Sequence, residues 1–325
     1  HLGDPDRPHD PNRALERFAE NLGNLDPSER RLIEDEGLES VPGPLRKEFD
    51  GLLEEVGHLS DSGNDFSVPT WQERPDAVLR LALGHATTTG TNQGLPWHEA
   101  ASRLGPIGRR VVKQFHRRAS GFVDHREAVS SMYTFGYGLF RPLLLELGRR
   151  LAERGLLQQP DDVMFLHIAE AKDALLDPRA AYSDTALSRK TEMGELLDAD
   201  MPDVIFGDDF VPARSNVQSA SRLRGVATSR GRYRGTLRIV KGIDDSAGVQ
   251  PGDVIAVPFS DVGWTPLFAR AGAVIAEAGG MLSHSSIVAR EYRIPCVVSV
   301  PGATRLRDGE TVVVDGYTGL VTVED

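Results

Sequence analysis

The sequence predicts an α + α/β fold, in which a mostly helical N-terminal domain precedes a compact α/β domain. Up to about residue 199, apolar residues recur at mixed spacings of three and four, which is typical of amphipathic helices. After Leu223, short runs rich in β-branched residues alternate with turn residues, which indicates a sheet. We therefore expect a helical domain at 1–199, a linker at 200–222 and an α/β domain at 223–325.

The composition excludes several classes of protein. A net charge of −11 argues against nucleic acid or an anionic membrane as the main partner. The single cysteine, Cys296, rules out an internal disulfide framework and suits a reducing compartment. No apolar run approaches the roughly 18–20 residues of a membrane span. We expect a cytoplasmic protein that binds neither nucleic acid nor a membrane.

The helical part divides into segments of ordinary length. Asp26-Pro27 is a plausible N-cap followed by proline at the first helical position. Glycine and proline between Gly136 and Pro142 predict an interruption of the last long helix, and 161–166 suggests a short strand or turn. The expected helices cover 13–22, 27–39, 45–59, 75–85, 99–104, 107–125, 126–154, 168–176 and 186–197.

The C-terminal part reads as short strands with little helix between them. Only 267–269 and 285–291 have a helical pattern there. The expected strands lie at or near 226, 236–240, 254–257, 273–275, 295–300, 311–314 and 319–323.

A glycine and serine-rich loop before the helix at 285–291 carries the clearest chemistry. Gly279 and Gly280 let backbone N–H groups approach an anion, and the start of a helix is electropositive. The hydroxyls of Ser283 and Ser285 add donors, so these four residues form a candidate phosphate site. His284 lies among them, where it can act as a nucleophile on phosphorus. On the loop alone, a helix-capping or surface role for His284 fits equally well. A metal site is not indicated, because no second His or Cys lies at ligand spacing from His284.

Residues 279–298, which read GGMLSHSSIVAREYRIPCVV, closely resemble the signature of the phosphohistidine swivelling domain of phosphoenolpyruvate (PEP)-utilising enzymes. The resemblance implies a compact β/β/α swivelling domain in which His284 takes a phosphoryl group from ATP at one site and delivers it at another. It also implies that Ser283 orients the imidazole. Arg290 and Glu291 match the family's motif, although a role on the helix surface fits them as well. Other segments that resemble the domain are 223–238, 251–257, 264–268, 308–309 and 315–319.

The helical part resembles the substrate-binding domain of the rifampicin phosphotransferase family. The resemblance implies that His58 and Asp65 face a substrate, that Arg126 binds the phosphoryl group and that Glu127 acts as a base. A solvated turn explains the loop around His58 equally well. The matching pieces, in order, are Gly57-His58, Asp65, Trp71-x-Glu73-x-Pro75, Arg126-Glu127 and 148–165.

The chain differs from that family in its domain content and at one residue of a motif. The family carries an ATP-grasp domain, and no stretch here has the length or the glycine-rich, lysine-bearing loop for it. The resemblance therefore implies that ATP and Mg²⁺ bind on a separate ATP-grasp domain or subunit, and we expect no cofactor or metal on this chain. Ser130 stands where the family motif Arg-Glu-x-x-Lys has lysine, which removes a cation from the site where the acceptor would bind. We expect Ser130 to contact an acceptor other than rifampicin.

These observations predict a phosphotransferase, or the phosphohistidine-carrying part of one. A phosphoryl group would pass from ATP through His284 to a hydroxyl of a small molecule, with 200–222 as the hinge. The product would be final or an intermediate activated for elimination. The alternatives are a PEP synthase-like transfer to pyruvate and a non-enzymatic histidine phosphocarrier subunit.

Overall fold

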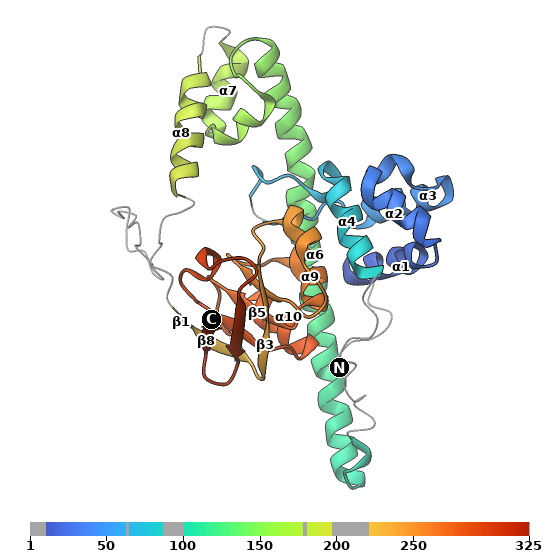
Figure 1. The fold of residues 1–325 in the computed structure, drawn as a ribbon. Coiled ribbons are helices and arrows are strands. Elements are labelled where there is room, and N and C mark those ends of the chain that lie inside the picture. Colours follow the sequence, from blue (N-terminus) through green and yellow to red (C-terminus); the bar gives the residue numbers. More distant parts are fainter. Residues whose placement is uncertain (1–10, 63–64, 87–100, 178–180, 197–220, 325) are drawn as a thin grey trace. The chain divides into compact units, whose positions relative to one another are not determined.

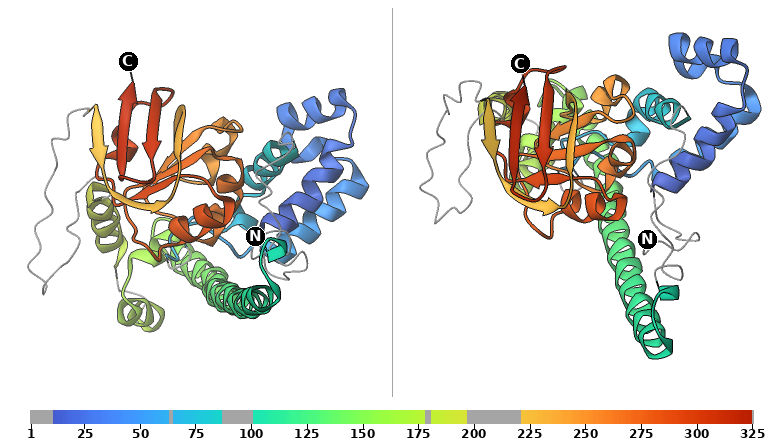
Figure 2. Two further views of the ribbon diagram at one scale, coloured as in Figure 1. Left: turned by 90° about the horizontal axis from the view of Figure 1, so that it is seen from below. Right: turned by 60° about the horizontal axis from the view of Figure 1, so that its bottom comes forward.

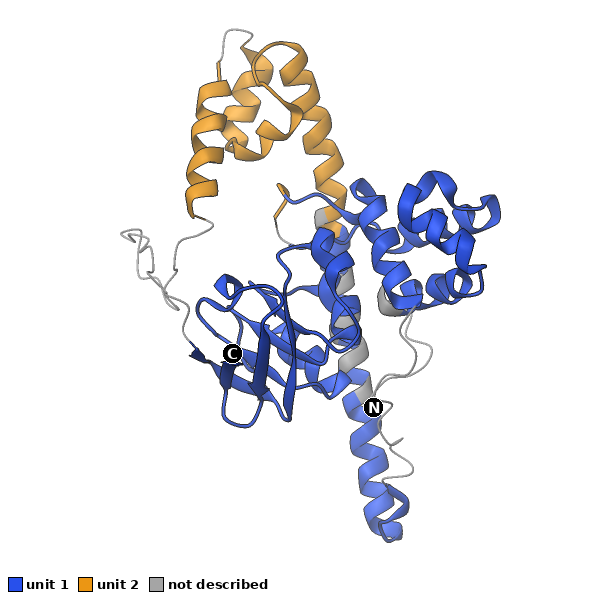
Figure 3. Ribbon diagram, in the orientation of Figure 1, with its two compact units in different colours: residues 1–63, 68–135, 219–325 blue, residues 64–67, 136–218 orange. Residues whose placement is uncertain are grey.

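The computed structural model describes residues 11–62, 65–86, 101–177, 181–196 and 221–324. The chain forms two compact units, one of residues 1–63, 68–135 and 219–325 and the other of residues 64–67 and 136–218 (Figure 3). Helices dominate the N-terminal part and a mixed sheet the C-terminal part, as an α + α/β fold requires (Figure 1). The predicted linker at 200–222 lies almost wholly outside the described residues.

The first unit begins with short helices whose ends the sequence encodes. At the start of α2, the Asp26 carboxylate accepts a hydrogen bond from Ser28 N at 2.8 Å, and Pro27 occupies the first turn. The helix ends earlier than predicted because Gly37 takes a φ of +73°, and a 3₁₀ turn, η1 (Gly37–Ser40), follows. The helices are α1 (Pro11–Gly23), α2 (Pro27–Glu36), α3 (Gly43–Val56) and α4 (Pro75–Ala86).

The long helix α6 (Pro106–Glu153) is continuous and contributes to both units. The interruption predicted near Gly136 to Pro142 is therefore wrong, since Pro142 lies inside the helix. Arg141, next to it, is buried in the second unit and donates hydrogen bonds to Phe66 O and Asp161. Such tertiary contacts override the local cost of a proline.

The second unit packs the end of α6 against three short elements. The segment 161–166 is a 3₁₀ helix, η3 (Pro160–Phe165), so the turn was the correct alternative and the strand was not. Gly148 of α6 is required sterically, because a Cβ there would lie 1.9 Å from Pro160 O. The remaining helices are α7 (Ile168–Leu176) and α8 (Ser183–Leu196), and the small core consists of Leu151, Leu156, Leu157, Val163, Ala174 and Ala186.

An eight-stranded mixed sheet forms the centre of the C-terminal part, in the order β1-β8-β7-β3-β4-β5-β6-β2. Strands β3 to β6 pair in parallel, and the other pairs are antiparallel. The strands are β1 (Arg222–Arg224), β2 (Val226–Ser229), β3 (Arg232–Ile239), β4 (Val254–Val257), β5 (Ala273–Ala276), β6 (Cys296–Val298), β7 (Thr311–Asp315) and β8 (Leu320–Glu324).

Two helices connect the parallel strands and lie side by side next to them (Figures 1 and 2). Helix α9 (Thr265–Arg270) joins β4 to β5, and α10 (His284–Tyr292) joins β5 to β6. Strand β4 is buried on both faces, since Ile255 belongs to one hydrophobic core and Val254 to another. This burial explains why the parallel strands read as unbroken apolar runs.

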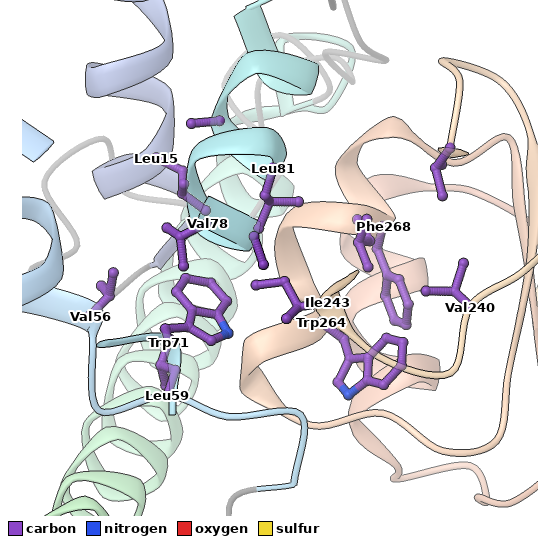
Figure 4. Close-up of a cluster of buried hydrophobic side chains, with 14 of the residues drawn as sticks. Leu15, Val56, Leu59, Trp71, Val78, Leu81, Val240, Ile243, Trp264 and Phe268 are labelled. Atoms are coloured by element: carbon purple, nitrogen blue, oxygen red, sulfur yellow. The ribbon is translucent and has the colours of Figure 1, made fainter. Parts of the chain in front are cut away.

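The helices α1 to α4 share a hydrophobic core with the sheet domain. Trp71, from the 3₁₀ turn before α4, and Leu81 of α4 belong to one buried cluster with Ile243, Trp264 and Phe268 of the sheet domain (Figure 4). Both tryptophans are at most 2% exposed. The first unit is therefore held together by a core to which both predicted domains contribute.

Polar contacts fix this packing in one geometry. Asp61 accepts hydrogen bonds from Arg74 Nη2 at 2.8 Å and from Ile243 N at 3.2 Å, and its carbonyl accepts one from Trp264 Nε1 at 2.9 Å. Burial raises the pKa of the Asp61 carboxyl, while Arg74 opposes that rise. The loop that the sequence suggested as substrate-facing thus also holds the sheet domain.

Candidate functional site

The nucleophile predicted from the sequence stands at the start of a helix, at the carboxyl edge of parallel strands. His284 is the first residue of α10, Ser283 is its N-cap, and the loop before them follows β5. Gly279 has a φ of +133°, and its carbonyl accepts a hydrogen bond from Ser299 Oγ at 2.6 Å. Ligands of open α/β sheets bind outside the carboxyl ends of the strands, next to helix N-termini.

The serine hydroxyls hold this loop to its helix. Ser283 Oγ donates to Gly280 O at 2.9 Å, and Ser286 Oγ donates to the same carbonyl at 2.7 Å. Ser285 is buried, and its Oγ lies 3.2 Å from Ser283 Oγ. The side of Gly280 where a Cβ would project is open, with no heavy atom within 4 Å. In this conformation the serine hydroxyls organise the loop, and the Gly280 backbone is left uncovered on that side.

Thr265, the first residue of α9, contacts His284 directly. Its Oγ1 lies 2.9 Å from His284 Nε2. A hydroxyl at this distance can donate to an imidazole nitrogen that carries no proton, or accept from one that does. The sequence did not identify Thr265 as a site residue, because nothing in a separation of 19 positions indicates that two side chains meet.

Arg290 braces the loop from the far end of α10. Its Nη2 donates to Met281 O at 2.9 Å and its Nη1 donates to Thr228 O at 3.2 Å. Arg293, which caps α10 after Tyr292, has a left-handed φ of 59°. Arg290 therefore ties the histidine loop to both α10 and β2, which is a positioning role.

A buried histidine of α4 contacts α9 at Pro266, the residue after Thr265. His85 Nε2 lies 2.9 Å from Pro266 O. Burial, and secondarily the charge of Arg270, lowers the pKa of His85 to about 4, so its imidazole is neutral at physiological pH. Arg270 is itself 5% exposed, donates to Val249 O, and packs so closely on Gly84 that a Cβ there would lie 2.0 Å from Arg270 Nη1.

The other predicted site residues lie on other elements of the chain. The ring of His58 meets that of Phe135 edge to face at 5.5 Å, and burial lowers the pKa of His58. Asp65 accepts hydrogen bonds from Ser67 N at 2.8 Å and Ser67 Oγ at 2.6 Å, which caps a local turn. His58 and Asp65 belong to different units. Helix α6 carries Arg126, Glu127 and Ser130, whose side chains lie outside the described residues.

In the described part of the chain, no group of three or more His, Cys, Asp or Glu side chains could hold a metal ion. Cys296 is fully buried, and burial raises the pKa of its thiol to about 11, which makes it a poor nucleophile. None of the helices that the structure describes is both long and apolar enough to traverse a bilayer.

Comparison with known proteins identifies the region around this loop. Residues 249–319 match the family model described as PEP-utilising enzyme, mobile domain. This range includes His284, the glycine and serine-rich loop, Thr265 and Arg290. The match to the swivelling domain that the sequence resembled is thereby confirmed.

Relatives match over most of the chain. The uncharacterized protein Rv2047c of Mycobacterium tuberculosis is 33% identical over 274 residues, which are 82% of this chain and 30% of that protein. The prodigiosin synthesizing transferase PigC of Serratia marcescens is 28% identical over 86% of this chain and 33% of its own length. The rifampicin phosphotransferase of Bacillus cereus is 27% identical over 90% of this chain and 35% of its own length. The chain thus spans about a third of the length of these relatives, and its residues 249–319 carry the mobile domain of PEP-utilising enzymes.

Proposed function

We propose that the chain carries a phosphoryl group on His284 and passes it from ATP, bound on an ATP-grasp domain or subunit, to a hydroxyl of a small molecule. The observation that carries the proposal is the placement of His284. It begins a nine-residue helix in the matched mobile domain, and its Nε2 lies 2.9 Å from Thr265 Oγ1. A nucleophile at a helix N-terminus has an electropositive surrounding for the phosphoryl oxygens that it acquires.

In the first half-reaction the Nε2 lone pair of His284 attacks phosphorus. A nitrogen–phosphorus bond forms, and the bond from phosphorus to the nucleotide oxygen breaks. Nε2 must carry no proton for this step, so the proton resides on Nδ1. In the proposed resting state the Thr265 hydroxyl donates to Nε2 and selects that tautomer. As the nitrogen–phosphorus bond forms, the same hydroxyl turns to a phosphoryl oxygen.

In the second half-reaction the acceptor hydroxyl attacks the phosphohistidine. An oxygen–phosphorus bond forms, the nitrogen–phosphorus bond breaks, and the hydroxyl proton passes to a base. The resemblance assigns that base to Glu127 and assigns binding of the phosphoryl group to Arg126, both on α6. Ser130 replaces a cation there, so a neutral side chain contacts the acceptor instead.

The names of relatives support phosphoryl transfer as the general activity. One relative is called rifampicin phosphotransferase, and a second, from Bacillus subtilis, is called an uncharacterized phosphotransferase. The relative from Serratia marcescens is named a transferase of prodigiosin synthesis. We therefore place the acceptor among small organic molecules.

Intact-mass analysis tests the proposal. The purified chain is incubated with ATP, Mg²⁺ and an ATP-grasp domain supplied as a separate polypeptide. The expected product is the chain plus one phosphoryl group, bound through an acid-labile bond, and His284→Ala should not form it. His58→Ala should still form it, because His58 belongs to the acceptor end in this scheme. An adduct that persists in His284→Ala would overturn the proposal.

A further inference from the structure

The first half of α6 carries an exposed apolar stripe. Its members are spread over 27 positions of the sequence, and every one is between 48% and 82% exposed. At about 100° per residue they fall within an arc of about 100° on one side of the helix. Contiguous exposed apolar surface of this kind marks interaction sites in soluble proteins. The α6 stripe consists of Ile107, Val111, Phe115, Phe122, Val129, Met132 and Tyr133.

The spacing within the α6 stripe is that of a helix–helix seam. From Val111 to Met132 the stripe follows the 3.5-residue period of coiled coils, and two positions of that series are not apolar, since they are Arg118 and His125. The seam extends over about 30 Å of helix. A helix lying on a membrane presents a wider apolar face. A narrow seam with heptad spacing fits a second helix better.

The charge around the seam defines the partner. Residues 106–123 contain five Lys or Arg and no carboxylate, although the whole chain has a net charge of −11. Arg118 lies in the seam itself, between Phe115 and Phe122, and is exposed. A guanidinium that becomes desolvated on docking requires a carboxylate opposite it. A second copy paired in register would place Arg118 against the same arginine.

We infer that the α6 stripe docks an amphipathic helix with acidic flanks and a carboxylate opposite Arg118. The source is the part of the family's proteins that this chain does not match, since the relatives carry about two thirds of their length outside the matched region. Docking removes the phenylalanine side chains of the seam from water, which favours association. The inference does not depend on the chemistry of His284.

Fluorescence anisotropy with designed peptides tests the inference. The probe is a labelled peptide of about four heptads with leucine at the seam positions and glutamate flanking them. A matched peptide carries lysine in place of every glutamate. The glutamate peptide should bind the chain at least about tenfold more tightly than the lysine peptide. The double variant Phe115→Ser/Phe122→Ser should lose binding, with its circular dichroism unchanged because both side chains are exposed.

A charge-reversal pair isolates the seam. Arg118→Glu and Lys113→Glu change the net charge equally, but Lys113 lies on the opposite side of α6, about 150° away. Only Arg118→Glu should abolish or reverse the preference for the glutamate peptide. Equal binding of both peptides, or no binding of either, overturns the inference. So does a dimer that the double phenylalanine variant abolishes, and so does binding to phosphatidylglycerol vesicles in place of the peptide.

Discussion

Replacement of His85 by glutamine should change how the stability of the first unit depends on pH. His85 is buried between α4 and α9, where burial and Arg270 lower its pKa from 6.5 to about 4. The folded protein therefore binds no proton on His85 between these values, whereas the unfolded chain does. Protonation below pH 6.5 favours the unfolded chain. The stability associated with the neutral imidazole is fully present above pH 6.5 and is lost as the pH falls toward 4.

The size of the effect follows from the two pKa values. Each unit of difference corresponds to about 1.4 kcal/mol, so the folded protein should lose up to about 3 kcal/mol between pH 6.5 and pH 4 through His85 alone. Glutamine keeps an N–H that can donate to Pro266 O but cannot take up a proton in this range. His85→Gln should therefore lose less stability than the natural protein, by that amount.

Urea unfolding at several pH values between 7 and 4 measures the free energy of unfolding at each pH. The decrease between pH 6.5 and pH 4 is then compared between His85→Gln and the natural protein. Tryptophan fluorescence reports on the right part of the molecule, because Trp71 and Trp264 both lie in the shared core of the first unit. The control is His167→Gln, at an exposed histidine of the second unit. If His85→Gln and the natural protein lose stability in parallel between pH 6.5 and pH 4, the reasoning from burial is wrong.

Four further substitutions test the candidate site. Thr265→Val should slow phosphorylation of His284 about tenfold, because the contact at 2.9 Å is lost, and should leave the melting temperature unchanged. A quenched-flow assay with radiolabelled ATP measures the rate. Gly279→Ala should destabilise the first unit by about 1–2 kcal/mol, because a φ of +133° suits only glycine. Gly280→Ala is the control and should not change the stability, since a Cβ there would meet no other atom. Thermal melts compare the two variants. Arg290→Gln should increase amide hydrogen exchange in the 279–284 loop, since the hydrogen bond to Met281 O is lost, and unchanged exchange there would contradict a bracing role.

The sequence predicted the type of most elements but not what they pack against. Apolar spacing identified α1 to α4 as helices, and β-branched runs identified the strands of the sheet. The same spacing cannot tell which surface covers an apolar face, so the core shared by Trp71 and Trp264 was not expected. The continuity of α6 through Pro142 was missed for a related reason, since contacts of Arg141 outweigh the local propensity of proline.

The candidate site was predictable where it is local in sequence. His284 and the glycines before it form one loop and the start of one helix, so their proximity follows from adjacency along the chain. Thr265 was missed because its contact with His284 depends on α9 packing against α10. The roles given to Arg126, Glu127 and Ser130 rest on resemblance to a family motif and stay predictions.

The shared core has a consequence for how this protein can be divided. A boundary drawn at residue 223 would separate Ile243 and Trp264 from the helices that cover them (Figure 4). A fragment consisting of the sheet domain alone would expose these side chains to water and would tend to aggregate. The helices α1 to α4 therefore cover one face of the sheet domain, and in the proposed mechanism any motion that carries His284 between two sites either takes these helices along or opens this core.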